Sequence, residues 1–353
     1  MVKYLIGSAL FLVVLAVGIL YLFPRVQLIS ESLLAQIEES EALPEIPKIT
    51  ELKAIYITSN TALGPSMDNI INLVKETELN SLVIDYDSRM KKLVRRLRFA
   101  GIFPVARILA FQHNGRALAH PELAVKNANG DLWKDSGGRY WLDPSGEETQ
   151  KIILEEAREA AKMGFGEINL DYIRFPSDGK LENTIYPFWS ANGGKKISRS
   201  DVITKFSKYI TDNLKKEFPN IKVSADLFGY LLLRDNDLGI GQSITELSQI
   251  FDYIYPMVYP SHYDSGNFNF TNPGEHPYEV VFQSLELGKK IFEKHQVPFE
   301  NIRPWIQDFN LGAFYTPEMV RLQMKATADA GLTKGWSVWN PNNKYRKEIF
   351  LTE

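Results

Sequence analysis

Cysteine is absent from the 353-residue sequence, which excludes disulfides, thiol nucleophiles and cysteine metal sites. Histidine is scarce, and the five histidines form no HxH or HExxH pair of the kind that zinc hydrolases use. The sequence also lacks a GxSxG elbow and the glycine-rich phosphate turns GxGxxG and GxxxxGK(S/T). These absences disfavour a zinc hydrolase, a serine hydrolase and a nucleotide-binding fold, and we expect no metal and no cofactor.

An excess of charge of one sign is also missing. The chain has 40 Lys and Arg against 43 Asp and Glu, which leaves a net charge of -3 and no basic block. Phosphate binding needs such a basic patch, so nucleic acid is not an expected partner. With 44% hydrophobic and 24% charged residues, the chain has the composition of a globular protein with a large core.

One long hydrophobic run is present, at the N-terminus. The stretch from Tyr4 to Phe23 has no charged residue and is flanked by Lys3 and Arg25, a length that spans a bilayer. No small-residue cleavage site follows it, so residues 1–24 are predicted to be an uncleaved transmembrane signal anchor, with residues 25–50 as a linker. The short N-terminal tail favours a single-pass cell-membrane protein whose remaining domain faces outward, in an extracytoplasmic position.

From residue 51 onward, short β-rich segments alternate with longer amphipathic ones. The expected strands cover residues 53–59, 81–87, 103–111, 167–175, 221–229, 252–259, 302–309 and 335–340. The expected helices cover residues 67–78, 89–99, 146–163, 199–217, 243–250, 277–295 and 317–330, and an eighth is only hinted at by "YRKEIF". Thr316 before Pro317 has the pattern of a helix start, and Gly164 and Gly331 stand where helices should end.

Strand–helix alternation predicts parallel strands with crossover helices. Eight units in about 300 residues favour a (β/α)8 TIM barrel over residues 51–353, with a doubly wound open sheet as the alternative. In a barrel, function lies at the C-terminal ends of the strands.

Side-chain alternation identifies the polar residues that point into this barrel. In "EINLDYIRF", Asn169 and Asp171 share one face, while Ile168, Leu170 and Tyr172 share the other face, which suits the helix layer. In "IKVSADLFG" the same argument turns Asp226 inward, with Ser224 and Phe228 on its face. We therefore expect two carboxylates on adjacent strands near the barrel mouth.

Further polar and aromatic residues accompany these carboxylates near strand ends. The candidate substrate-binding residues are Arg107, Asn169, Arg174, Tyr255, Tyr259, Trp305, Gln307 and Trp339. Asp308 has the opposite parity to Gln307 but lies near a strand end, where alternation often fails. His113 and His262 each follow a strand, and a solvated loop position is the favoured interpretation for both. Aromatic faces beside carboxylates and amides are typical of a sugar-binding cleft.

A pair of carboxylates permits glycoside hydrolysis, in which one group donates a proton and the other acts as nucleophile or activates water. Arg107 or Arg174 could keep one carboxylate ionised while proximity raises the pKa of the second. An interior ion pair between Asp171 and one of these arginines, closing the barrel mouth, explains the same pattern equally well.

Six motifs occur in order between about residues 52 and 345: "WLDPSGEETQ", "DYIRFPSDG", "SADLFGY", "YIYPMVYPSHY", "RPWIQDF" and "GWSVWNPNNKY". Together they resemble a glycoside-hydrolase-like domain family of unknown function whose members carry a DYIRFPSD signature. The resemblance implies a TIM barrel of the glycosidase type, commonly found on exported or membrane-anchored bacterial proteins.

The chain is also distantly similar to the α-amylase-like barrels, in which carboxylates follow the fourth, fifth and seventh strands. That similarity implies Asp171 as nucleophile, Asp226 as general acid and Asp308 as stabiliser of the transition state. The sequence departs from the pattern twice: the acid is normally glutamate, and the second strand runs quickly into "SRMKKL". The loop after that strand is therefore expected to contribute little to the cleft.

The main hypothesis is a membrane-anchored glycosidase acting on a cell-envelope or exported polysaccharide. The alternative is a non-catalytic glycan-binding barrel tethered to the membrane through residues 4–23. A barrel enzyme for phosphorylated small molecules needs a glycine-rich site after the seventh or eighth strand, where "NLGAFYTPEM" supplies only Gly312.

Overall fold

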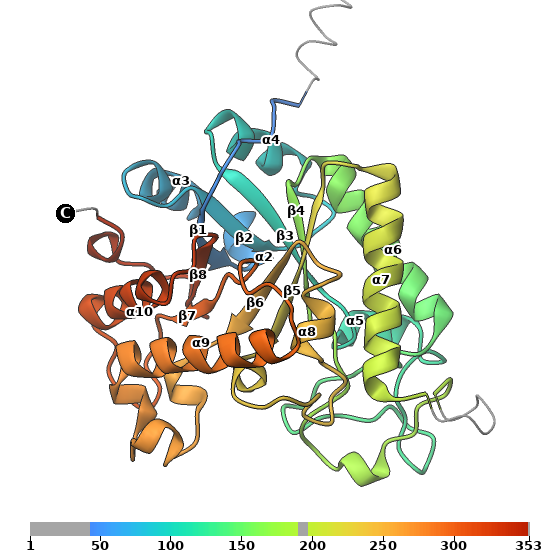
Figure 1. Ribbon diagram of the computed structural model, residues 1–353. Coiled ribbons are helices and arrows are strands. Elements are labelled where there is room, and N and C mark those ends of the chain that lie inside the picture. The colour runs from blue at the N-terminus through green and yellow to red at the C-terminus, as the bar shows by residue number, and fades with distance from the viewer. Residues whose placement is uncertain (1–42, 190–196, 352–353) are drawn as a thin grey trace, which may run out of the picture. The chain divides into compact units, whose positions relative to one another are not determined.

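A closed barrel of eight parallel strands forms the centre of the protein (Figure 1). The computed structural model describes residues 43–189 and 197–351, and the chain from Glu45 onward is one compact unit. Neighbouring strands pair in chain order, and β8 pairs with β1 to close the barrel. The strands are β1 (Leu52–Ile57), β2 (Ser81–Asp85), β3 (Phe103–Leu109), β4 (Glu167–Asp171), β5 (Lys222–Phe228), β6 (Tyr253–Met257), β7 (Trp305–Gln307) and β8 (Gly335–Trp339). The predicted parallel barrel is confirmed.

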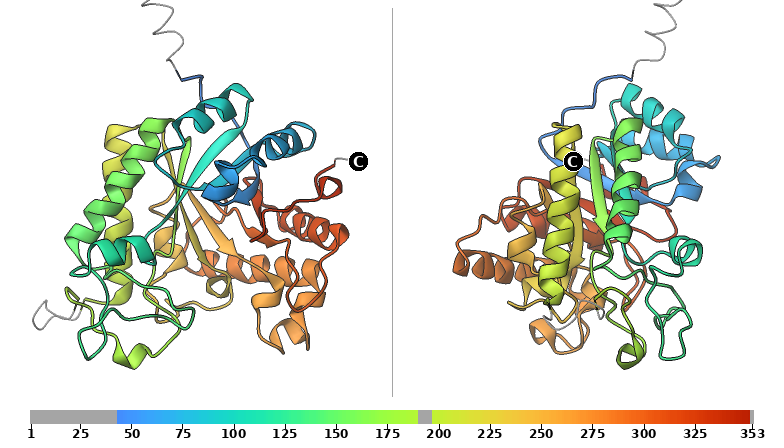
Figure 2. Two further views of the ribbon diagram at one scale, coloured as in Figure 1. Left: turned by 180° about the vertical axis from the view of Figure 1, so that it is seen from behind. Right: turned by 90° about the vertical axis from the view of Figure 1, so that its right-hand side faces the viewer.

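Helices surround the barrel on its outside (Figure 2). The α-helices are α2 (Ser59–Ala62), α3 (Met67–Lys75), α4 (Lys91–Phe99), α5 (Asn114–Ala119), α6 (Glu147–Met163), α7 (Arg199–Glu217), α8 (Ile244–Leu247), α9 (Pro277–Lys294) and α10 (Pro317–Asp329). Local chemistry sets their ends: Thr316 accepts a hydrogen bond from the Met319 N–H at the start of α10, and Gly164 ends α6 at φ 98°. The hinted eighth helix is a short 3-10 turn, η6 (Lys347–Ile349).

Two strands are shorter than their hydrophobic patterns predict. The segment expected to be a strand to residue 175 ends at Asp171, and the seventh strand spans only Trp305–Gln307. Tyr172 adopts φ 54°, a left-handed conformation that a strand cannot continue through. The strand therefore ends at Asp171, four residues before the predicted end.

Two apolar clusters lie on opposite sides of the strands. The larger one fills the layer between the barrel and the helices and includes Ile168, Leu170 and Val223. The smaller one fills the barrel itself and consists of Leu52, Ala54, Tyr56, Val83, Phe103, Val105, Tyr255, Tyr259 and Trp305. This division is the predicted one, since successive side chains of a strand point to opposite faces.

The barrel interior is filled with side chains at the N-terminal end of its strands. Ile46 and Ile49, in the extended segment before β1, pack against the inner cluster. Above them, the Arg303 guanidinium donates a hydrogen bond to Glu167 at 2.8 Å, and the Tyr255 hydroxyl donates to the other Glu167 oxygen at 2.8 Å. Both charged side chains are buried, and a cavity lined by Arg107, Asp171 and Asp226 lies at the opposite end, where the strands terminate.

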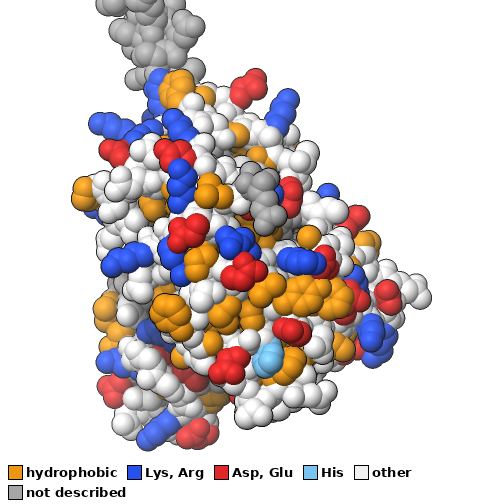
Figure 3. Space-filling model, turned by 90° about the vertical axis from the view of Figure 1, so that its left-hand side faces the viewer, with side chains coloured by type: hydrophobic (Ala, Val, Ile, Leu, Met, Phe, Trp, Pro, Cys, Tyr) orange, Lys and Arg blue, Asp and Glu red, His pale blue; other side chains and the backbone are white. Residues whose placement is uncertain are grey.

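The surface carries charges of both signs. On the face that Figure 3 shows, acidic and basic side chains are interspersed, as expected for a net charge of -3. The predicted transmembrane segment, residues 4–23, lies outside the described residues. Within residues 43–189 and 197–351, no helix is both long enough and apolar enough to cross a bilayer.

The Glu167–Arg303 pair gives a stability prediction. Arg303→Met should lower the free energy of unfolding by about 3–5 kcal/mol, because it leaves the Glu167 charge buried without its partner. Adding Glu167→Gln to Arg303→Met should recover part of the loss. Urea unfolding followed by circular dichroism measures both effects. Lys151→Met, which breaks an exposed pair with Glu148, is the control and should change stability little. Equal stability of Arg303→Met and the wild-type protein would contradict the prediction.

Candidate active site

A cavity of about 350 Å³ opens at the C-terminal end of the barrel. Strands β3 to β8 each contribute to its wall, as do the loops after β4, β5 and β6. The lining residues are Arg107, Asp171, Tyr172, Arg174, Asp226, Phe228, Gly229, Tyr230, Gln242, Met257, Tyr259, His262, Tyr263, Trp305 and Trp339. The cavity has the size and position of a small-ligand site in a barrel of this type.

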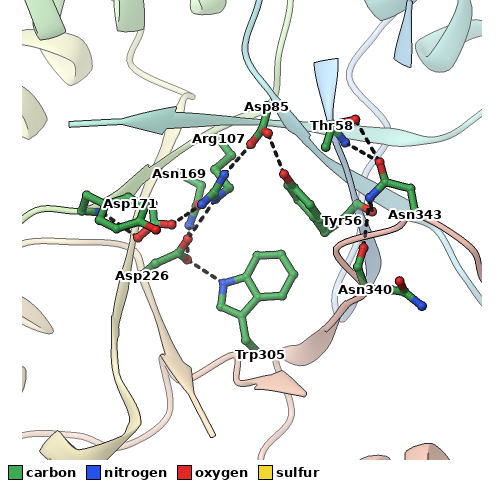
Figure 4. Close-up of polar contacts among 11 residues, drawn as sticks. Tyr56, Thr58, Asp85, Arg107, Asn169, Asp171, Asp226, Trp305, Asn340 and Asn343 are labelled. Atoms are coloured by element: carbon green, nitrogen blue, oxygen red, sulfur yellow. Dashed lines mark hydrogen bonds and ion pairs between the residues drawn. The ribbon is translucent and has the colours of Figure 1, made fainter. Parts of the chain in front are cut away.

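Arg107 is the central charged group of this cavity (Figure 4). Its Nη1 donates to Asp85 at the end of β2, and its Nη2 donates to Asp171 at the end of β4. Its Nε lies 3.6 Å from the Asp226 Oδ2 on β5. Burial opposes the charge of this guanidinium, but the surrounding carboxylates outweigh burial and raise the pKa of Arg107. One permanent cation therefore holds three carboxyl groups from three strands around itself.

Asp226 differs from its two neighbours in its surroundings. Its Oδ1 accepts hydrogen bonds from the Trp305 Nε1 at 2.7 Å and the Asn169 Nδ2 at 2.9 Å. Burial, followed by repulsion from Asp171, raises the pKa of the Asp226 carboxyl from 3.8 to about 8, although Arg107 and the two donors lower it. Because Oδ1 already accepts two N–H groups, the proton of neutral Asp226 belongs on Oδ2.

Asp171 is fixed by its own backbone as well as by Arg107. The Tyr172 N–H donates to Asp171 Oδ1 at 2.6 Å across the left-handed turn that ends β4. Such a conformation is strained for a residue with a side chain and is often found at functional sites. The turn also brings Tyr172 to the cavity wall, while its side chain still packs against the larger apolar cluster, as the sequence pattern predicts.

Aromatic rings form one wall of the cavity. Trp339 stacks on Tyr56 with ring centroids 3.8 Å apart, and Trp305 meets Trp339 edge-on at 5.6 Å. The Arg107 guanidinium carbon lies 4.9 Å from the Trp339 ring centre. Tyr259 completes this wall, and burial raises the pKa of its hydroxyl well above 10, which keeps it a hydrogen-bond donor. Flat apolar faces beside hydrogen-bonding groups suit a pyranose ring.

Most of the predicted site residues lie at this cavity. Asp171, Asp226, Arg107, Arg174, Tyr259, Trp305 and Trp339 line it. Asn169 stands behind Asp226 and binds it through the side-chain amide.

Besides Asn169, three predicted site residues do not line the cavity, and their contacts explain why. Tyr255 lies deeper in the barrel with its hydroxyl on Glu167. Gln307 is buried and accepts from the Ser261 N–H at 3.1 Å, so it holds the loop after β6. Asp308 accepts from Arg346 at 2.9 Å, and burial raises the pKa of its carboxyl. The similarity to α-amylase-like barrels suggested a third carboxylate at Asp308, and its contacts with Arg346 and Asn340 place it outside the group around Arg107.

Asp85 supplies the third carboxylate instead. It receives the Tyr56 hydroxyl at 2.6 Å in addition to Arg107, so the last residue of β2 contributes to the site. The loop after β2 supplies no residue to the described cavity wall, as expected. Alternation could have found Asp85, because it shares a face with Ser81 and Val83, and Val83 belongs to the inner cluster. Tyr56 is recoverable in the same way from Leu52 and Ala54.

The two histidines near strand ends have different environments. His262 lines the cavity, and burial lowers the pKa of its ring, so it is neutral near pH 7. His113 accepts from the Arg116 N–H and caps α5. In the part of the chain that the structure describes, no three Asp, Glu or His side chains are grouped as ligands for a metal ion.

Residues 86–345 match the family described as "Putative glycosyl hydrolase domain". The chain belongs to this family. The match covers more than half of the chain and includes every carboxylate of the site except Asp85, which lies one residue before it. A search of the curated proteins found no match.

Two α-galactosidases of known structure resemble the chain in fold. The α-galactosidase of Thermus thermophilus is 14% identical with a TM-score of 0.51, over 87% of this chain and 61% of that one. The α-galactosidase AgaA of Geobacillus stearothermophilus is 10% identical with a TM-score of 0.53, over 85% of this chain and 40% of that one. A hypothetical protein from Ruminiclostridium thermocellum is 26% identical over 53% of this chain and 98% of its own length, with a TM-score of 0.42. This chain therefore spans less than two thirds of either galactosidase.

The raised pKa of Asp226 predicts a pH-dependent stability. The folded protein binds the Asp226 proton more tightly than the unfolded chain between about pH 4 and about pH 8, so stability should fall as pH rises through this window. The slope from this group is at most about 1.4 kcal/mol per pH unit. Asp226→Asn should flatten the slope, so its stability relative to wild type should rise with pH. Urea unfolding at several pH values measures this, with Asp212→Asn on the exposed face of α7 as control. A parallel pH dependence in Asp226→Asn and wild type would contradict the assignment.

Proposed function

We propose that the protein is a glycosidase that cleaves O-glycosidic bonds through Asp226 and Asp171. The observation that carries the proposal is a carboxyl group with a raised pKa beside an ion-paired carboxylate, both lining one aromatic cavity at the C-terminal end of a glycosidase-type barrel. Groups whose environments differ in this way divide the acid and base roles between them.

Asp226 is the general acid in this proposal. It carries a proton near neutral pH and transfers it to the glycosidic oxygen as the bond from that oxygen to the anomeric carbon breaks. Trp305 and Asn169 hold the other oxygen of the carboxyl, so the proton-bearing oxygen keeps its orientation. Their N–H groups also stabilise the carboxylate that remains after transfer.

Asp171 is the second carboxylate. It either attacks the anomeric carbon or takes a proton from the water that does so, and its negative charge stabilises the positive charge that develops on the sugar ring. The contacts from Arg107 and the Tyr172 N–H fix its position. Trp305, Trp339 and Tyr259 provide the apolar and hydrogen-bonding surface on which a sugar ring can lie.

The ion pair between Arg107 and Asp171 also favours a second candidate function. A barrel whose mouth carboxylates are all tied to one arginine could bind a glycan without cleaving it. Asp171 would then act as a hydrogen-bond acceptor for sugar hydroxyls rather than as a reactant.

The location of the substrate is part of the proposal. The uncharged run from Tyr4 to Phe23 supports a membrane anchor, with the barrel on the outer side of the cell membrane. A cell-envelope or exported polysaccharide is the polymer that an enzyme in this position would meet.

Activity should depend on both carboxylates. Asp171→Asn and Asp226→Asn should each lower the rate of reducing-end release by about 100-fold or more, because each removes one of the two groups that the reaction requires. The full-length chain is incubated with a panel of bacterial and plant polysaccharides, and new reducing ends are measured. Asp308→Asn is the matched control, because Asp308 pairs with Arg346 away from the Arg107 group, and its rate should stay within a few fold of wild type.

Two outcomes would overturn the assignment. Full activity in Asp171→Asn removes that residue from the chemistry. Binding of a glycan without release of reducing ends, unchanged in Asp226→Asn, identifies the binding barrel instead.

The pH profile tests the role of Asp226 separately. The ratio kcat/KM should fall as pH rises through about 8, because only the protonated carboxyl can act as acid. Trp305→Phe removes a hydrogen bond that lowers the pKa of Asp226, so this variant should lose activity at a higher pH than wild type. Trp336→Phe, on β8 with its ring against Phe350 in the helix layer, should leave the profile unchanged. A shift toward lower pH in Trp305→Phe would contradict the role of Asp226.

A further inference from the structure

Arg174 is a buried cation without a carboxylate partner. Its side chain is 6% exposed, and it lines the cavity three residues after Asp171. Among residues 43–189 and 197–351, no Asp or Glu forms an ion pair with it. Asp171 and Asp178 contribute to the field around it, but Asp171 pairs with Arg107 and Asp178 accepts from the Ser136 N–H. Burial lowers the pKa of Arg174, and the field of Asp171 and Asp178 only partly offsets this effect.

Aromatic rings hold the Arg174 guanidinium in place. Its central carbon lies 4.6 Å from the ring centre of Phe228, 4.8 Å from that of Trp141 and 5.3 Å from that of Tyr172. These contacts stabilise a cation, but the rings supply no strong hydrogen-bond acceptor for its N–H groups. The Nη1 donates to the Phe175 carbonyl at 3.1 Å and to the Ser177 hydroxyl at 3.2 Å.

The other edge of the guanidinium is available. Nε and Nη2 have no acceptor within the described ranges, and neither is sealed from solvent. Side by side on one edge, these two N–H groups match the two oxygens of a carboxylate. Arg107 shows the contrast, because its Nη1 and Nη2 are both taken up by carboxylates of the protein itself.

We propose that Arg174 is the subsite for a carboxylate on the substrate, so that the protein acts on a glycan containing acidic sugars such as uronic acids. This inference rests on the proposed function for the identity of the ligand as a sugar. A singly charged carboxylate is the anion that fits, because it balances the one unpaired cation of the cavity. A phosphate monoester would bring a second negative charge, whereas a sulfate ester carries one charge and can also bind the fork with two oxygens, so it is the competing anion in the test.

The distribution of charge in the cavity, rather than its sum, supports the same ligand. Two side chains are positive, Arg107 and Arg174, and two are negative, Asp85 and Asp171. Asp226 is protonated near neutral pH. The charges cancel in number, but both anions are bound to Arg107, so Arg174 is a locally unpaired positive charge on its side of the cavity. A neutral sugar would leave that charge buried and unpaired, which is costly in a site closed by a bound ligand.

Binding measurements on the Asp226→Asn variant test the inference without requiring turnover. Saturation-transfer NMR compares glucuronate, galacturonate, mannuronate and N-acetylneuraminate with glucose, galactose and mannose, and galactose 6-sulfate is the test of a different anion. At least one acidic sugar should bind about tenfold or more tightly than its neutral counterpart. Adding Arg174→Gln should remove the preference, and Arg174→Lys should keep part of it. Adding Arg234→Gln should leave the preference intact. Arg234 is exposed and does not line the cavity, although it lies over the ring of Tyr230, which does.

Stability separates the binding role from a structural one. Removing an unpaired buried charge should leave the melting temperature of Arg174→Gln equal to wild type or above it, whereas a structural cation would lower it on removal.

Several outcomes would overturn the inference. These are equal binding of acidic and neutral sugars, an acidic preference that survives Arg174→Gln, no binding of any acidic sugar, or tighter binding of the sulfate ester. If neutral sugars bind and are the units released by the wild-type protein, the proposed glycosidase stands while the acidic subsite fails. If acidic sugars bind through Arg174 and no polymer is cleaved, the subsite stands while the glycosidase fails.

Discussion

The guanidinium of Arg107 is the interaction on which the site depends. It lies inside the barrel and joins the ends of β2, β4 and β5 through Asp85, Asp171 and Asp226. A closed barrel permits this arrangement, because the carboxyl ends of all its parallel strands face one space. Three carboxyl groups in a buried volume would repel one another without a cation among them. Arg107 therefore links the strands through its contacts, and its positive charge reduces the repulsion among the carboxyl groups at this end of the barrel.

The position of the proton follows from the same arrangement. Arg107 is one positive charge, and Asp85 and Asp171 bound to it already exceed that charge by one. Ionising Asp226 as well would add a further negative charge in a place that water hardly reaches, since its side chain is 1% exposed. The carboxyl with the weakest contact to Arg107, at 3.6 Å, is the one whose pKa is raised. Asp171 is paired closely with Arg107 and Asp226 only weakly, so a carboxylate and a protonated carboxyl group lie in the same site. General acid catalysis requires such a pair.

Much of the fold and part of the site follow from the sequence. The period-two pattern of "EINLDYIRF" and "IKVSADLFG" places Asn169, Asp171 and Asp226 inward, and the structure has them there. The pattern works because each strand is buried on both faces, so a one-residue slip would put carboxylates among the apolar helices. Asp85 obeys the same rule and was recoverable from Val83. The barrel itself is recoverable because strands and amphipathic helices alternate along the sequence, and several helices carry a local signal, such as the cap at Thr316.

The rest of the site depends on loop conformation and on contacts between distant segments, which the alternation of residues along a strand does not predict. Tyr172 takes φ 54°, which breaks the alternation and turns the chain so that Arg174 reaches back into the cavity among Trp141 and Phe228. Trp141 is more than thirty residues away in the chain, in the long segment between β3 and α6, and only the folded structure brings it to Arg174. Likewise Asp308 has the residue type of a catalytic group, but Arg346, beyond β8, supplies its partner. The residue type at a strand end therefore identifies a candidate site residue. Its partners from distant loops decide whether its charge is paired within the protein, as for Asp308, or remains available to bind a ligand, as for Arg174.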